Sequence, residues 1–145
     1  MSTTDSLIYK SRSNNTNSTD HNQESDQLGT RLRDALKYGI DKNIKKIRME
    51  EAVSLINQDI EVGKGCFGIC NKAKYTIKDK IEEAVAKNCI FRSEKELACL
   101  IFEINTVGSF KHRHIARLYC YAEESHPRYK DRGDIILIME DWTWL

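Results

Sequence analysis

The chain has 145 residues, the length of a single domain with one modest core. Hydrophobic residues make up 40% and charged residues 31%, and the net charge of +1 gives no reason to expect nucleic acid or an anionic membrane as the main partner. No apolar run approaches the roughly 20 residues that span a bilayer, and the N-terminus lacks the apolar region of a secretory signal.

The cysteine usage is typical of an intracellular, reducing compartment. The chain has five cysteines, an odd number with no Cys-x-x-Cys pair, and they are scattered through apolar segments: Cys66, Cys70, Cys89, Cys99 and Cys120. We interpret them as small buried hydrophobic residues and expect a cytoplasmic protein. A zinc site that combines Cys66 and Cys70 with His112 and His114 is the alternative, although these spacings fit no common ligand pattern.

The first 28 residues are rich in Ser, Thr, Asn, Asp and Gln and have few large apolar side chains. Such a segment buries too little apolar surface to offset the entropy of ordering it, so residues 1–28 are predicted to be a disordered tail. Residues 29–56 are predicted to be an amphipathic helical lead-in, because Leu32, Leu36, Ile40 and Ile44 recur every four residues. This helix is expected to dock on its own domain; a helix that binds a partner or a membrane surface is the alternative.

From about Ile60 the hydrophobic period changes toward two, which predicts strands. The expected strands are residues 60–62, 69–77, 84–91, 115–121 and 135–139, with a polar hairpin tip at 78–80. Between the third and fourth strands, Ser93 and Glu96 form a capping-box pattern at the start of a helix. The apolar residues of that helix share one face at helical spacing: Leu97, Leu100, Ile101, Ile104 and Val107. Residues 57–145 are therefore expected to form one domain.

The glycine-rich run from Val62 to Cys70 is the most informative motif. It reads Val-Gly-Lys-Gly-Cys-Phe-Gly-Ile-Cys, with glycines at 63, 65 and 68. A turn without side chains at these positions lets backbone amides approach phosphate oxygens closely, and Phe67 at its tip would shield the phosphates from water. Taken alone, a tight hairpin explains the run equally well.

The residues after the glycine run make the pattern more specific. Lys87 ends the sequence Ala-Val-Ala-Lys twenty residues after Phe67, and Glu103 lies sixteen residues further along, in the predicted helix. This order resembles the amino-terminal lobe of the eukaryotic protein kinase family over roughly residues 55–142. The resemblance implies an α+β fold, a kinase-like N-lobe with a five-stranded antiparallel sheet and one C-helix. It also implies that Lys87 contacts the α- and β-phosphates of ATP and that Glu103 holds Lys87 in place.

Two later segments extend the resemblance. Residues 110–118 are similar to the family's connection from the helix to the fourth strand, which implies a structural role in a turn for His112. Residues 137–142 are similar to the fifth strand running into the hinge, so Met139 would be the gatekeeper, and the backbone of Glu140 and Trp142 would hydrogen-bond adenine. The cofactor-binding residues that the resemblance implies are Val62, Gly63, Lys64, Gly65, Cys66, Phe67, Gly68, Cys70, Val85, Lys87, Glu103, Met139, Glu140 and Trp142.

Two residues of that set differ from the family's usual choices. Cys70 stands where valine is usual, and Val85 replaces a usual alanine and adds bulk where the purine would lie. No His-Arg-Asp loop and no Asp-Phe-Gly motif follow the hinge in this sequence. We therefore expect no catalytic residues and no catalysis by this chain alone, and we expect Mg²⁺ only together with a C-lobe.

The leading hypothesis is the ATP-binding lobe of a Ser/Thr-type protein kinase, truncated and inactive on its own. The alternative is a pseudokinase-like, non-catalytic interaction module that binds or mimics a kinase, or pairs with a C-lobe partner protein. The apolar face of the predicted helix would then be the binding surface. A third interpretation is a decayed reading frame without a stable product.

Overall fold

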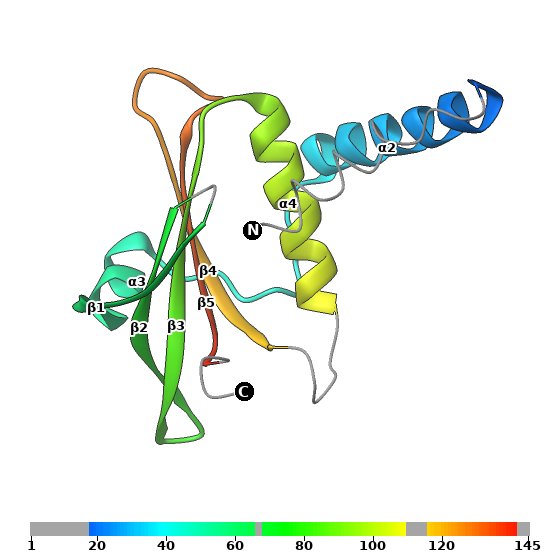
Figure 1. The fold of residues 1–145 in the computed structure, drawn as a ribbon. Helices are drawn as coiled ribbons and strands as arrows, with labels where there is room; N and C mark the ends of the chain where they lie inside the picture. The colour runs from blue at the N-terminus through cyan, green and yellow to red at the C-terminus, as the bar shows by residue number, and fades with distance from the viewer. Residues whose placement is uncertain (1–17, 66–67, 110–115, 142–145) are drawn as a thin grey trace.

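The computed structural model describes residues 18–65, 68–109 and 116–141, and within the first helix it describes side chains from residue 27 onward. The described residues form an α+β fold in which three helices accompany one antiparallel sheet of five strands (Figure 1). In chain order the elements are α2 (Ser18–Tyr38), α3 (Met49–Leu55), β1 (Ile56–Gly65), β2 (Gly68–Ile77), β3 (Lys80–Phe91), α4 (Glu94–Ser109), β4 (Leu118–Ser125) and β5 (Gly133–Glu140). The expected class and strand number are confirmed.

The strands lie in the order β1-β2-β3-β5-β4, and every neighbouring pair is antiparallel. In the chain, α4 follows β3 and precedes β4. In the sheet, β4 lies at an edge, and β5 lies between β3 and β4 and pairs with both. A central strand is covered on both faces, which explains the continuous apolar run of β5. Its four consecutive residues Ile135, Ile136, Leu137 and Ile138 are all buried, as predicted.

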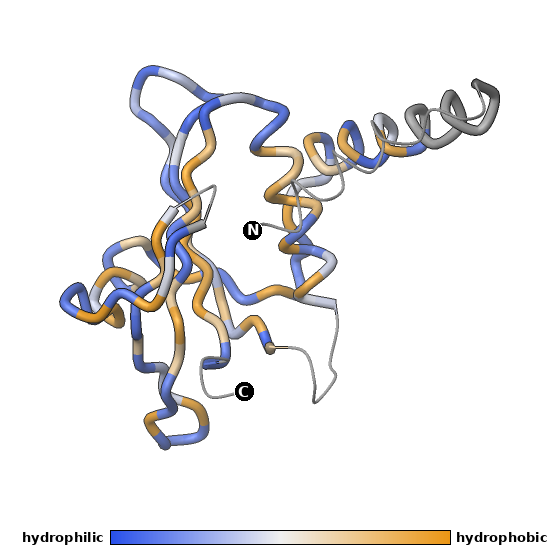
Figure 2. The backbone as a smooth tube through the Cα atoms, in the orientation of Figure 1, coloured by the Kyte–Doolittle hydropathy of each residue, from blue (hydrophilic) through white to orange (hydrophobic). Residues whose placement is uncertain are grey.

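The two faces of the sheet pack against different helices. On one face, which we call the α3 face, Ala86 of β3 packs in a cluster with Ala52 of α3. On the other, the α4 face, Cys89 of β3 packs in a cluster with Leu100 and Ile104 of α4. Figure 1 shows α3 and α4 on opposite sides of the sheet. The connection between β4 and β5, which leaves the sheet, is mostly hydrophilic (Figure 2). Because side chains alternate along a strand, this pattern assigns each residue of β3 to one helix or the other.

A two-residue turn connects β2 to β3. Lys78 and Asp79 have φ angles of 49° and 64°, the combination of a type I′ turn, whose twist matches that of a hairpin. The predicted hairpin tip at 78–80 is therefore in place. The strand that follows begins at Lys80, four residues before the expected start, because backbone pairing with β2 continues down to the turn through polar residues.

Helix α4 begins with the expected serine cap. The Glu96 amide donates to Ser93 Oγ at 3.2 Å. The Glu96 carboxylate, however, accepts from the Arg92 amide at 2.6 Å rather than from the amide of Ser93. The cap therefore differs from the predicted reciprocal box in one hydrogen bond, because the amide that Glu96 accepts from belongs to Arg92, the residue before Ser93.

The N-terminal segment differs most from expectation. Helix α2 already begins at Ser18, inside the segment predicted to be a disordered tail, and it ends at Tyr38 instead of continuing to residue 56. Gly39 explains the end, because its φ of +73° is the left-handed conformation that terminates helices, and its amide donates to the Ala35 carbonyl at 2.8 Å. Residues 1–17 of the predicted tail lie outside the described residues.

After Gly39 the chain runs along β4 before it forms α3. The Ile47 amide donates to the Tyr121 carbonyl at 2.9 Å, and the Tyr121 amide donates to the Lys45 carbonyl at 3.0 Å. Ile44 packs on the α4-face cluster, whereas Ile47 is buried in the α3-face cluster. The four-residue spacing that predicted one long helix therefore has a different origin, since Ile40 and Ile44 anchor a segment of bends and a turn to the domain.

Helix α2 projects away from the sheet, and its C-terminal part contacts α4 (Figure 1). Ala35 of α2 packs against Ala98 and Ile101 of α4, with Leu32 beside them. The prediction that the amphipathic helix docks on its own domain is confirmed for these residues. Among the described residues, no helix combines the length and apolar character needed to cross a membrane.

Candidate functional site

Strand register brings three predicted site residues into one row across the sheet. Gly63 pairs with Cys70, and Cys70 pairs with Lys87. The row continues through Leu137 of β5, which belongs to the cluster packed against α4. Residues that pair directly across strands share a face. Gly63, Cys70 and Lys87 therefore lie together on the α4 face.

Helix α4 brings Glu103 to Lys87. The Lys87 Nζ and Glu103 Oε1 atoms are 4.0 Å apart, and the two side chains are 18% and 9% exposed. Glu103 follows Leu100 by one turn, so packing of that apolar face against the sheet directs the carboxylate inward. Lys87 and Glu103 therefore form a mostly buried ion pair, in the row of the sheet that contains Gly63. These are the two residues that the resemblance pairs.

A second row on the same face contains Lys72, Val85 and Met139. Val85 is fully buried, and Met139 is partly buried against the α4-face cluster. Lys72 forms an ion pair and hydrogen bond with Asp141, whose side chain is only 3% exposed. Sequence analysis did not single out Lys72 or Asp141. The alternation of β2 could have placed Lys72 on the face of Cys70, but no local signal indicates that Asp141 is buried.

The thiols near Lys87 are protonated at neutral pH. Burial raises the pKa of the Cys70 thiol, although the nearby Lys87 charge opposes the shift. Burial raises the pKa of Cys89 to about 12, again against the opposing effect of Lys87. A nucleophilic or metal-binding cysteine requires the thiolate. These two cysteines therefore act as packing residues, as predicted for the cysteines in general.

The glycines of the turn have different structural constraints. Gly68 has a φ of +154°, and a Cβ there would lie 1.8 Å from the Asn88 carbonyl oxygen, so the close approach of β2 to β3 requires glycine. A Cβ at Gly63 would meet nothing within 4 Å, so packing does not require glycine there. Gly65 pairs with Gly68, so the pairing of β1 with β2 extends to both glycines.

The remaining predicted site residues divide into three groups. Val62 is half-buried and Lys64 is exposed on β1. The Glu140 amide donates to the Arg117 carbonyl at 2.8 Å, so it already has a partner inside the protein. Of the two backbone groups of Glu140, only the carbonyl could therefore hydrogen-bond adenine. Cys66, Phe67 and Trp142 lie outside the described residues.

The zinc alternative gains no support from the part of the chain that the structure describes. Within that part, no group of three or more His, Cys, Asp or Glu side chains could hold a metal ion. Of the four candidate ligands only Cys70 is described, and its raised pKa disfavours metal binding. Cys66, His112 and His114 lie outside the described residues.

Comparison with known proteins adds no family to this picture. The chain matches no protein-family model, and a search of curated proteins finds no similar sequence. What the protein does must therefore be inferred from the Lys87 site itself.

Proposed function

We propose that this chain is the ATP-binding lobe of a Ser/Thr-type protein kinase. The observation that carries the proposal is the Lys87–Glu103 pair on the face of the sheet that also carries Gly63. Protein kinases orient the phosphates of ATP with a lysine on the third strand, and a glutamate of the following helix holds that lysine. Lys87 lies on β3, and Glu103 lies on the helix that follows β3.

The electrostatics of the site suit a phosphate ligand. The Lys87 side chain is 18% exposed, and the Glu103 carboxylate at 4.0 Å limits its orientation. Two unit charges 4 Å apart attract by about 4 kcal/mol at the effective dielectric constant near a protein surface. A triphosphate would bring several negative charges to the same ammonium, and the open space at Gly63 leaves room for its oxygens.

The test is the affinity for ATP of Lys87→Met, measured by isothermal titration calorimetry on the full chain. Methionine keeps the length and apolar stem of the side chain but removes the charge, so we expect at least about a tenfold loss of affinity with the fold retained. Lys95→Met is the matched control, because Lys95 is an exposed residue of α4 and its loss should leave the affinity unchanged. Equal affinities of Lys87→Met and the parent protein would contradict the site.

A second candidate function is a kinase-like interaction module that does not bind nucleotide. The specific observation in its favour is the row beside Lys87, where the fully buried Val85 and the Lys72–Asp141 pair take up the surface on which a base would rest. Overfilling a pocket by two methyl groups opposes binding by about 1–3 kcal/mol.

Val85→Ala separates the two functions. If the base site is merely overfilled, this substitution raises the affinity for ATP by about tenfold or more. If the parent protein and Val85→Ala both fail to bind ATP while circular dichroism shows the fold intact, the interaction module is favoured. Ile138→Val is the matched control, since Ile138 is buried on the α3 face and should change stability without changing affinity for ATP.

A further inference from the structure

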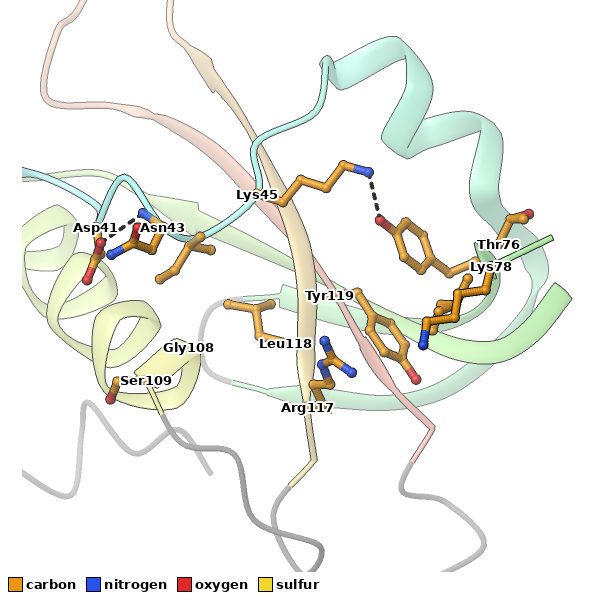
Figure 3. A pocket seen from close by; sticks show the side chains of 13 residues that line it. Asp41, Asn43, Lys45, Thr76, Lys78, Gly108, Ser109, Arg117, Leu118 and Tyr119 are labelled. Atoms are coloured by element: carbon orange, nitrogen blue, oxygen red, sulfur yellow. Dashed lines mark hydrogen bonds between the residues drawn. The ribbon is translucent and has the colours of Figure 1, made fainter. Parts of the chain in front are cut away.

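A hollow lies away from Lys87, between β2, β4, the segment before α3 and the C-terminal end of α4 (Figure 3). Its volume is about 830 Å³, within the range of small-ligand sites. Tyr75 and Tyr119 line it and pack against the α3-face cluster, on the face of the sheet opposite Lys87, whereas Ile44 and Leu118 at its other end pack on the α4-face cluster. We call it the basic groove, and its defining residues are Lys45, Tyr75, Lys78, Arg117 and Tyr119.

The floor of the groove is a pair of stacked tyrosines. The rings of Tyr75 and Tyr119 are nearly parallel, with centroids 5.1 Å apart and an interplanar angle of 11°. Lys45 Nζ donates to the Tyr75 hydroxyl at 3.1 Å, and the Arg117 guanidinium lies 5.9 Å from the Tyr119 ring centroid. Figure 3 shows Lys45, Arg117 and Lys78 around this pair.

The lining has an excess of positive charge. It contains three cations and one carboxylate, Asp41, which lies at the end of the groove near α4 and accepts from the Asn43 amide at 2.9 Å. Within the described part of the chain, neither Lys78 nor Arg117 has a carboxylate within ion-pair distance. Glu82 and Glu140 lie near enough to Tyr119 to act on its pKa, but they do not line the groove.

Lys45 and Tyr119 hold their protons at neutral pH. The hydrogen bond to Tyr75 raises the pKa of Lys45, so this ammonium is charged at neutral pH. Burial, and then the charges of Glu140 and Glu82, raise the pKa of Tyr119, so its hydroxyl remains a donor. Lys78 contributes its charge from a left-handed backbone conformation, with a φ of 49°, where a residue with a side chain is uncommon.

We propose that the basic groove binds a phosphate monoester, carried either by a peptide side chain or by a small molecule. Such a group bears about −1.5 to −2 charges at pH 7 and has three strong acceptor oxygens. These oxygens match two ammonium groups and a guanidinium, the last of which can bind a phosphate through two parallel hydrogen bonds. The Thr76 hydroxyl also lines the groove. The Ser109 hydroxyl, at the α4 end, already donates to the Thr106 carbonyl at 2.8 Å. The basic groove shares no residue with the Lys87 site, so phosphate binding there can be tested independently of ATP binding.

The test is a titration of the full chain with O-phospho-L-serine and with a tripeptide that has a central phosphoserine, followed by amide chemical shifts in NMR spectra. We expect shifts at Lys45, at residues 76–78 and at residues 117–119, and none with serine. The double variant Lys78→Gln and Arg117→Gln should weaken binding by about tenfold or more, because two charge-assisted contacts are lost. Lys80→Gln is the matched control, since Lys80 is an exposed lysine outside the groove.

The outcomes separate the two sources of the phosphate. Tighter binding of the phosphopeptide than of O-phospho-L-serine indicates a protein ligand, and equal binding indicates a small phosphate ester. Binding should strengthen between pH 5 and pH 7, because the phosphate loses its second proton near pH 6. Absence of shifts at the groove amides, or an affinity that the double variant leaves unchanged, would overturn the proposal.

Discussion

The two charged surfaces of this protein share no residue, and they differ in how their cations are neutralised. On the α4 face, Lys87 and Lys72 pair with the buried carboxylates of Glu103 and Asp141. In the basic groove, the described residues place no carboxylate within ion-pair distance of Lys78 or Arg117. A buried ammonium loses its hydration and needs a partner, whereas an exposed cation keeps its water. The first surface should therefore contribute to stability, and the second should attract anions.

The largest expected effect concerns the close packing beside the Lys87 site. Gly68→Ala would place a Cβ 1.8 Å from the Asn88 carbonyl oxygen and force an unfavourable φ, so we expect a loss of about 3–5 kcal/mol in the free energy of unfolding. Urea denaturation measures it. Gly63→Ala is the control, because a Cβ there contacts nothing within 4 Å and should change stability by less than about 0.5 kcal/mol. Equal losses in the two variants would show that the glycine turn is not positioned by this contact.

The next effect tests whether the α4 face depends on its ion pair. Glu103→Leu leaves the Lys87 ammonium without its carboxylate in a site where that side chain is 18% exposed, so we expect a loss of about 2–4 kcal/mol in unfolding free energy. The double variant Lys87→Met with Glu103→Leu removes both charges and should recover most of that loss. If the double variant is less stable than the single one, the pair does not act as an isolated buried ion pair.

The smallest effect is expected in the basic groove. Arg117→Gln removes an exposed cation whose only described ring contact is with Tyr119 at 5.9 Å, so the unfolding free energy should change by less than about 1 kcal/mol. Thermal denaturation at low and high salt measures this change. A loss comparable to that of Glu103→Leu would remove the contrast between the two surfaces, because Arg117 would then be part of the packing that supports the sheet.

Local signals in the sequence were sufficient for several elements. The uninterrupted apolar run of β5 indicated a central strand, and Ser93 marked the start of α4. The lead-in helix was predicted too long at its C-terminal end, because the spacing of Leu32 to Ile44 outweighed the helix-ending glycine at position 39. Its N-terminal end was missed because a polar segment does not reveal a helix through hydrophobic periodicity.

The sequence by itself determined the order of the five strands and of α4, because periodicity is encoded within short windows, and the resemblance to the protein kinase family singled out Lys87 and Glu103. Only the tertiary structure decided that β5 lies between β3 and β4, that Asp141 is buried against Lys72, and that Tyr75 stacks on Tyr119. These last contacts join residues 69 and 44 positions apart in the chain. No local pattern specifies such pairs, since they form only when the register of three strands and the packing of α3 and α4 bring distant side chains together.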